Sequence, residues 1–141
     1  MTSDSVVQDM FAVLQGQAAS VVTRWTYLVD DPFAVTFSIR TRSDRWVTWV
    51  MARELLLAGL TDNVGVGVGV GDIRLRPCRV HGYEVLVVEI SSPDGHAALE
   101  VDRDLLGRFV QGTTELVPLG SEISVLDMDA EIEKITRSCA E

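Results

Sequence analysis

Hydrophobic and polar residues alternate with a period of two over much of the first third of the chain. The alternation is unbroken in FAVTFSIR, residues 33–40, and it recurs in residues 19–29 and 45–51. Successive side chains of a β-strand point to opposite faces, so the pattern predicts three half-buried strands. The short polar segments between them predict an antiparallel meander. The side chains expected to face the core in the clearest strand are Phe33, Val35, Phe37 and Ile39.

Three other segments are typical of helices. ARELLLAGL, residues 52–60, is rich in helix formers and predicts a short helix that Gly59 ends. Asp102 is placed to cap a second helix, which Gly112 ends. DMDAEIEKITRS, residues 127–138, predicts a final helix with Asp127 as its N-cap. The apolar residues of the first two helices expected to pack inwards are Leu55, Leu56, Ala58, Leu105, Leu106, Phe109 and Val110.

Further strands are predicted between the first two helices. Residues 73–76 alternate between apolar residues and arginine, and Pro77 weakens or ends that strand. After a turn at His81-Gly82, the segment EVLVVEI, residues 84–90, is apolar on both faces, which is typical of a central strand covered from both sides. Residues 97–101 predict a last short strand.

The start of the chain is ambiguous, because residues 5–14 fit either a strand or a helix; the strand is favoured. No segment has the composition of a linker. The predicted fold is therefore a single α+β domain over residues 1–141, built on largely antiparallel β-sheets with a short mid-chain helix and C-terminal helices.

Composition narrows the classes of partner. The 141 residues are 47% hydrophobic and 23% charged, as in globular proteins, and the formal net charge is −9. That charge disfavours nucleic acid as a partner. Two groups of arginines are nevertheless close enough in the sequence to allow a local basic patch. The chain has no run of 18 apolar residues, and the segment MTSDSVVQDM lacks the positive charge of a signal peptide, so we expect a cytoplasmic protein. The arginine groups are Arg40, Arg42, Arg45 and Arg74, Arg76, Arg79.

The tract GVGVGVG, residues 65–71, invites comparison with phosphate-binding loops. A dinucleotide fingerprint would need a glycine at Val70 and a strand before a helix, but the predicted order here is helix then strand. A Walker loop would need Gly-Lys-Ser/Thr where the chain has Gly71-Asp72-Ile73. We therefore interpret the tract as a flexible connection or a glycine-weakened strand edge.

Three other groups of residues suggest chemistry but fit simpler roles. SSPDGH, residues 91–96, contains a serine, an acid and a histidine, but consecutive residues of a turn do not form a catalytic triad. Cys78 and His81 lack the further ligands of a zinc site, even with His96, and Cys78 and Cys139 are expected to be free thiols. Asp127 and Asp129 are explained by helix capping. We predict no catalytic, metal or cofactor residue, and hence no enzyme.

The three tryptophans fall on different faces of the predicted strands. Trp25 and Trp49 share faces with apolar residues and are expected in the core. Trp46 lies on the face opposite to Trp49. It is therefore a candidate for a subunit or partner contact, or else it packs under a second covered face of the sheet.

Six segments, in order along the chain, resemble the SsgA-like proteins, small sporulation and cell division regulators of actinobacteria. The similarity runs from about Thr26 to Ile135, and the ordered set is more specific than any one piece. The segments are DPFAVTFSI (31–39), WVMARELLLAGL (49–60), GDIRLRP (71–77), ISSPDGHAALEV (90–101), VPLGSE (117–122) and LDMDAEI (126–132). The family has a shorter glycine segment and a tryptophan at the position of Arg76. These differences leave open which paralogue of the family the chain represents, and an SsgB type is one of the candidates.

The resemblance implies a non-enzymatic regulator that helps position the septum in sporulation-specific division, in one member by recruiting the tubulin-like protein FtsZ. It also implies a homotrimer, recruited to the division septum, with a fold similar to the plant Whirly and mitochondrial guide-RNA-binding proteins. It supplies no catalytic motif. The alternative function is single-stranded nucleic-acid binding, which the similar fold and the arginine groups beside aromatic residues suggest.

Overall fold

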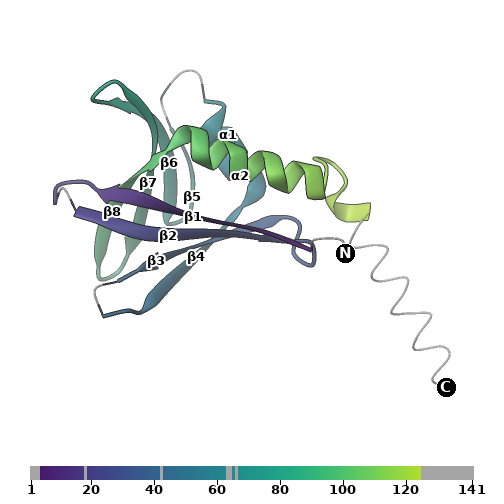
Figure 1. The fold of residues 1–141 in the computed structure, drawn as a ribbon, viewed down its shortest axis with the longest axis horizontal. Coiled ribbons are helices and arrows are strands. Elements are labelled where there is room, and N and C mark those ends of the chain that lie inside the picture. The colour runs from purple at the N-terminus through teal and green to yellow at the C-terminus, as the bar shows by residue number, and fades with distance from the viewer. Residues whose placement is uncertain (1–3, 18, 42, 63–64, 66, 125–141) are drawn as a thin grey trace.

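One curled antiparallel sheet of eight strands carries the described part of the chain, together with two helices (Figure 1). The computed structural model describes residues 4–17, 19–41, 43–62, 65 and 67–124. The spatial order of the strands is β4-β3-β2-β1-β8-β7-β6-β5. The elements are β1 Ser5–Leu14, β2 Ala19–Leu28, β3 Ala34–Arg40, β4 Trp46–Ala52, α1 Arg53–Leu60, β5 Val68–Val70, β6 Ile73–Val80, β7 Tyr83–Ser92, β8 Gly95–Asp102 and α2 Arg103–Leu116.

The sheet consists of two four-stranded meanders, each followed by a helix. Strands β1 to β4 pair in chain order and lead into α1, and strands β5 to β8 pair in chain order and lead into α2. The meanders are joined where β1 pairs with β8, through three residue pairs from Ala12↔Val101 to Leu14↔Leu99. The eight strands therefore form one continuous curled sheet, a half-barrel, and α2 lies across it and packs on β1, β7 and β8 (Figure 1).

The core lies between the concave face of the sheet and the two helices. A row of aromatic rings crosses it: Trp25 stacks on Phe37 with ring centroids 4.9 Å apart, Phe37 stacks on Trp49 at 5.6 Å, and Phe109 of α2 approaches Trp25 at 6.4 Å. Burying each large apolar side chain contributes about 1.5–3 kcal/mol. The expectation of a core position is confirmed for Trp25, which is fully buried, whereas Trp49 is partly buried and packs against the core.

Most predicted elements are confirmed, including the strand at residues 5–14 and the capping of α2, where Asp102 Oδ1 accepts from the Leu105 backbone N–H at 3.1 Å. The expectation that Phe33 faces the core is wrong. Strand β3 begins one residue later, at Ala34, and Phe33 lies in the preceding turn with 46% of its surface exposed. The predicted helix beginning at Asp127 lies outside the described residues.

The two glycines expected to end helices do not end them. Gly59 lies inside α1, and a Cβ added there would be 2.9 Å from the Cβ of Leu75 on β6. Gly112 lies inside α2, where an added Cβ would be 3.3 Å from a methyl group of Val6. At both positions the helix packs so closely on the sheet that a side chain would not fit without a shift, which explains why glycine is present. The helices continue through these glycines because glycine costs only about 1 kcal/mol in a helix interior.

Strand β6 continues through Pro77 to Val80, so the proline does not end it. Strand β5 covers β6 only as far as Leu75, and beyond that point β6 is the edge of the sheet. Proline is tolerated on an edge because its missing N–H has no neighbouring strand to bond. The central position of β7 is confirmed, with Leu86, Val87 and Val88 all buried although they alternate between its faces.

Candidate interaction surface

The glycine tract binds a carboxylate of its own chain. The backbone N–H groups of Gly65 and Gly67 donate to the two carboxylate oxygens of Asp62, at 3.2 and 2.9 Å. Residues 68–70 then form the edge strand β5, which confirms the strand-edge interpretation for that part. Successive backbone N–H groups can form an anion site, but here the anion is Asp62. The tract therefore stabilises the connection between α1 and β6.

Alanine at Gly67 should destabilise the protein more than alanine at Gly65. Both glycines have positive φ, 94° and 77°, but an added Cβ at Gly67 would also lie 3.2 Å from the backbone oxygen of Leu75, while none of the described atoms lies within 4 Å at Gly65. We expect a loss of about 1–3 kcal/mol for G67A and about 1 kcal/mol for G65A, measured by urea unfolding. Equal losses would show that the tract does not pack against β6.

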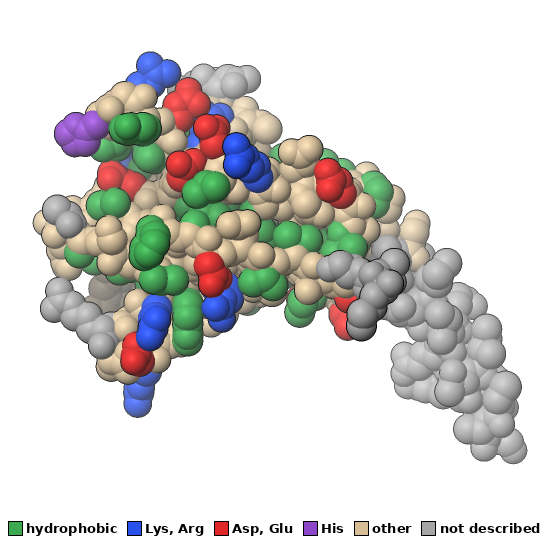
Figure 2. All heavy atoms as spheres, viewed as in Figure 1, with side chains coloured by type: hydrophobic (Ala, Val, Ile, Leu, Met, Phe, Trp, Pro, Cys, Tyr) green, Lys and Arg blue, Asp and Glu red, His purple; other side chains and the backbone are tan. Residues whose placement is uncertain are grey.

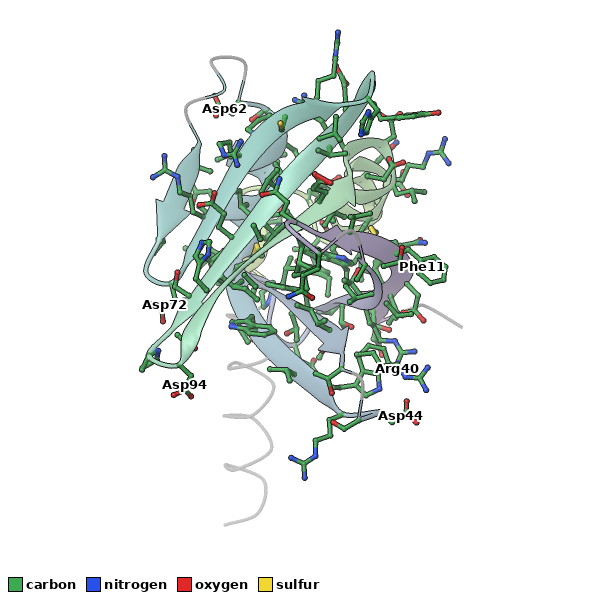
Figure 3. The ribbon with its side chains drawn as sticks, turned by 90° about the vertical axis from the view of Figure 1, so that its left-hand side faces the viewer. Phe11, Arg40, Asp44, Asp62, Asp72 and Asp94 are labelled. Atoms are coloured by element: carbon green, nitrogen blue, oxygen red, sulfur yellow. The ribbon has the colours of Figure 1, made fainter. Side chains whose placement is uncertain are left out.

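Three of the six arginines of the two groups are paired with acids in the part of the chain that the structure describes. Arg40 pairs with Asp44 at 2.7 Å, Arg76 with Glu89 at 3.5 Å and Arg79 with Glu84 at 3.4 Å, and Figure 3 shows Arg40 and Asp44 beside one another. The Arg40–Asp44 and Arg79–Glu84 pairs contribute little to stability because they are exposed, whereas Arg76–Glu89 is partly buried; each pair brings an acid to the arginine. Arg42 lies outside the described residues, and Arg74 lies beside Gly67.

The other candidate residues from the sequence are distributed as turn and strand residues. Ser91 and His96 face one another across the β7–β8 hairpin, and Asp94 lies in the turn beyond them, at the far end of the sheet in Figure 3. Cys78 is a free, half-buried thiol on β6, and Cys139 lies outside the described residues. Within the described ranges, no three His, Cys, Asp or Glu side chains are grouped as metal ligands.

A buried arginine that the sequence analysis did not single out joins two of the segments that carry the resemblance, residues 49–60 and 117–122. Arg53, at the start of α1, is 1% exposed. Its Nη1 donates to the carbonyl oxygens of Thr113 and Val117, at 3.1 and 2.7 Å, and its Nη2 donates to Glu122 Oε1 at 2.5 Å. These bonds fix the start of α1 to the end of α2 and the segment that follows it.

An aromatic ring completes the surroundings of Arg53. Its guanidinium carbon lies 4.9 Å from the centroid of the Tyr27 ring, and the Tyr27 hydroxyl donates to the carbonyl oxygen of Pro32 at 2.9 Å. Burial raises the pKa of Tyr27, whereas the backbone N–H of Glu122 and the guanidinium of Arg53 lower the pKa of the Glu122 carboxyl. The polar groups of Arg53, Tyr27 and Glu122 are hydrogen-bonded to other groups of the protein, so we assign this cluster a structural role.

Several exposed apolar side chains lie on the convex face of the sheet. Phe11 projects outward from β1, as Figure 3 shows, and is 73% exposed. Trp46 on β4 is 39% exposed and lies under the Arg24 guanidinium, whose carbon is 4.8 Å from the ring centroid. Tyr83, at the β6–β7 turn, is 75% exposed. Apolar surface left in water on this scale is typical of a protein contact surface.

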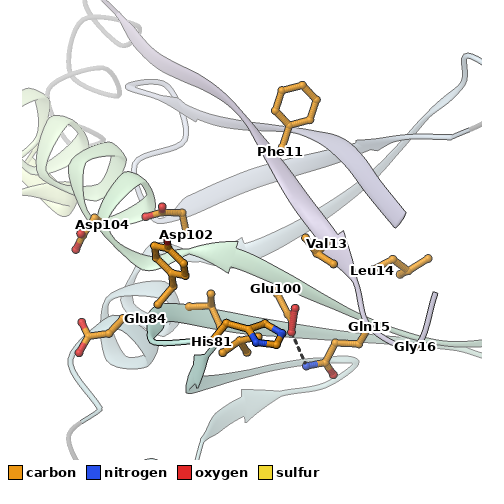
Figure 4. Close-up of a pocket in the computed structure, with 13 residues that line it drawn as sticks. Phe11, Val13, Leu14, Gln15, Gly16, His81, Glu84, Glu100, Asp102 and Asp104 are labelled. Atoms are coloured by element: carbon orange, nitrogen blue, oxygen red, sulfur yellow. Dashed lines mark hydrogen bonds between the residues drawn. The ribbon is translucent and has the colours of Figure 1, made fainter. Parts of the chain in front are cut away.

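Phe11 and Tyr83 line one hollow of about 950 Å³, shown in Figure 4, which we call the Phe11–Tyr83 hollow. It lies over β8, between the end of β1, the β6–β7 turn and the start of α2. Its apolar residues are accompanied by four acidic residues, and Figure 2 shows acidic side chains gathered over the start of α2. The lining residues used below are Phe11, Val13, Val80, Tyr83, Val85, Glu84, Glu100, Asp102 and Asp104.

The geometry thus defines a small α+β protein with exposed aromatic side chains on a curled sheet. The family model described as Streptomyces sporulation and cell division protein, SsgA, matches residues 21–122, and the chain belongs to this SsgA-like family. The predicted resemblance is confirmed. No helix in the described part of the chain is long and apolar enough to cross a membrane.

Individual relatives support the assignment of the chain to this family. The chain is 33% identical over 132 residues to the sporulation-specific cell division protein SsgB of Frankia casuarinae, covering 92% of this chain and 90% of that protein. It is 38% identical over 109 residues to SsgB of Streptomyces coelicolor, covering 77% of each. The crystal structure of an SsgA-like sporulation-specific cell division protein from Thermobifida fusca superposes with a TM-score of 0.82 at 32% identity, covering 95% of this chain and 98% of that one.

Proposed function

We propose that this protein is a non-enzymatic adaptor of sporulation-specific cell division, which helps to position the septum by binding division proteins such as FtsZ. The observation that carries the proposal is family membership over residues 21–122, together with relatives named as sporulation-specific cell division proteins. The exposed aromatic residues Phe11 and Tyr83 support a role in protein contacts. The adaptor acts as a homo-oligomer, a trimer, in the cytoplasm and at the septum.

Deleting the gene should reduce the number of correctly placed septa in sporulating cells, and the intact gene should restore them. A fluorescent fusion should gather at septa, purified protein should co-sediment with FtsZ polymers, and light scattering should give the mass of a trimer. The arginines at positions 40, 76 and 79 pair with acids, so single-stranded DNA at low salt serves as a probe that we expect not to bind. Normal septation in the deletion strain would contradict the proposed function.

A further inference from the structure

We propose that the Phe11–Tyr83 hollow is a docking site for a basic segment of another protein, one with an aromatic or aliphatic side chain next to arginine or lysine. The inference rests on the proposed adaptor function and specifies the chemistry of the partner. It is carried by two observations: the most exposed aromatic side chains of the described residues line one hollow, and the charged residues that line it, apart from a histidine, are acidic.

The apolar part of the hollow is presented by rigid elements. Tyr83 pairs with Val80 across a two-residue turn, in which His81 and Gly82 have φ of 50° and 83°. Positive φ at both central residues is the geometry of a tight hairpin turn, which holds Tyr83 in place. Phe11 lies within β1, opposite Val22 of β2. The backbone that carries the two aromatic residues is thus fixed before binding, and exposed aromatic residues often dominate the binding energy of protein interfaces.

The polar part of the hollow is negatively charged. Four of its lining residues are acidic, one is a histidine, His81, and none is lysine or arginine. The acids are Glu84, Glu100, Asp102 and Asp104. The neighbouring Arg79 lies 3.4 Å from Glu84 in an exposed pair. Glu100 accepts from the neutral amide of Gln15 at 3.3 Å, the bond drawn in Figure 4.

The remaining acids belong to the start of α2. Asp102 is its N-cap, bonded to the Leu105 N–H at 3.1 Å, and Asp104 lies in its first turn. Arg103 and Arg108 line an adjoining hollow with Glu84 and Asp104, so with Arg79 there are three arginines beside the four carboxylates. None of these arginines lines the Phe11–Tyr83 hollow itself, where an incoming basic group meets the carboxylates and gains electrostatic energy. A second copy of the chain is the competing occupant, and the light-scattering measurement below separates it from a basic segment of another protein. The complementary partner is a basic segment of a different protein.

The test uses the full chain and fluorescence anisotropy. The probe is a labelled peptide with a central Trp-Leu pair flanked on each side by two arginines, and its matched controls carry glutamates in place of the arginines or alanines in place of Trp-Leu. We expect micromolar binding of the basic aromatic peptide, with both controls at least about fivefold weaker. Binding should weaken when sodium chloride is raised from about 50 to 500 mM, because the charges are exposed.

Variants of the protein assign the binding to the hollow. F11A and Y83A should each raise the Kd about fivefold or more, and E100Q and D104N about two- to fivefold at low salt. V50A and L119A change exposed apolar residues that do not line the hollow, and they should leave the Kd unchanged. Circular dichroism should show a native fold for all six variants. Equal effects of F11A and V50A, or equal binding of the glutamate peptide, would overturn the proposal.

Two further outcomes are decisive. If F11A and Y83A change the mass measured by light scattering and leave peptide binding unchanged, the occupant is a second copy and the proposal is wrong. Failure of this inference is separable from failure of the proposed function, because the deletion strain tests the latter alone. A septation defect without peptide binding removes only the docking site.

Discussion

Replacing Arg53 with methionine should lower the free energy of unfolding by about 3–5 kcal/mol, the usual loss when one partner of a buried ion pair is removed. Methionine keeps the apolar stem, but Glu122 then lacks its cation and the carbonyl oxygens of Thr113 and Val117 lack their donor. Urea unfolding followed by circular dichroism measures the change. R24M is the matched control: it also breaks an arginine–acid pair, with Asp9, but both side chains are about half exposed, so the unfolding midpoint should move little.

The ion pair also predicts a pH dependence. The folded protein lowers the pKa of Glu122, so the stability that the carboxylate contributes is fully present above its unfolded pKa of about 4.3 and is lost as the pH falls through the lower folded value. In E122Q this contribution is absent, and the unfolding free energy should fall less steeply below about pH 4.3 than in the wild type. Parallel acid limbs for the two proteins would show that Glu122 is not coupled to folding.

Replacing Trp25 with alanine should cost about 3–5 kcal/mol, since it removes a fully buried side chain from the centre of the aromatic row. It also removes the indole N–H that donates to Thr23 Oγ1 at 3.0 Å; that hydroxyl donates in turn to the carbonyl oxygen of Met10 at 2.8 Å. W46A is the control: Trp46 is half-exposed beside Arg24, and its loss should cost about 0.5–1 kcal/mol. Similar losses for the two variants would mean that Trp25 does not anchor the core.

The strands could be predicted because their evidence is local. Alternation along residues 33–40 is a property of neighbouring residues, and it located β3 to within one residue. Phe33 was misassigned because the pattern continues one residue beyond the ladder, where the turn begins. Gly59 and Gly112 were misassigned for a different reason: a glycine that ends a helix and one that admits a neighbouring side chain look the same in sequence.

The Arg53 cluster and the Phe11–Tyr83 hollow could not be predicted in the same way, because the residues of each come from distant parts of the chain. Arg53 and Glu122 are 69 residues apart, and the sequence offers no signal that joins them except that both lie in segments resembling the family. Phe11 lay in a segment that fitted a strand or a helix, so the sequence did not define the direction in which its side chain points. Its meeting with Tyr83 and with acids of β8 and α2 depends on the joining of the two meanders.

That joining has a consequence for biosynthesis. Strand β1 is made first, yet its pairing with β8 waits until residues 99–101 have left the ribosome. Until then the β1–β4 meander has a free edge at β1, and α2, which covers the concave side, has not been made. Closing a contact between residues this far apart is slow compared with forming local hairpins. The nascent first half is thus the species most exposed to misassociation, and completion of β8 is the event that commits the chain to its native sheet.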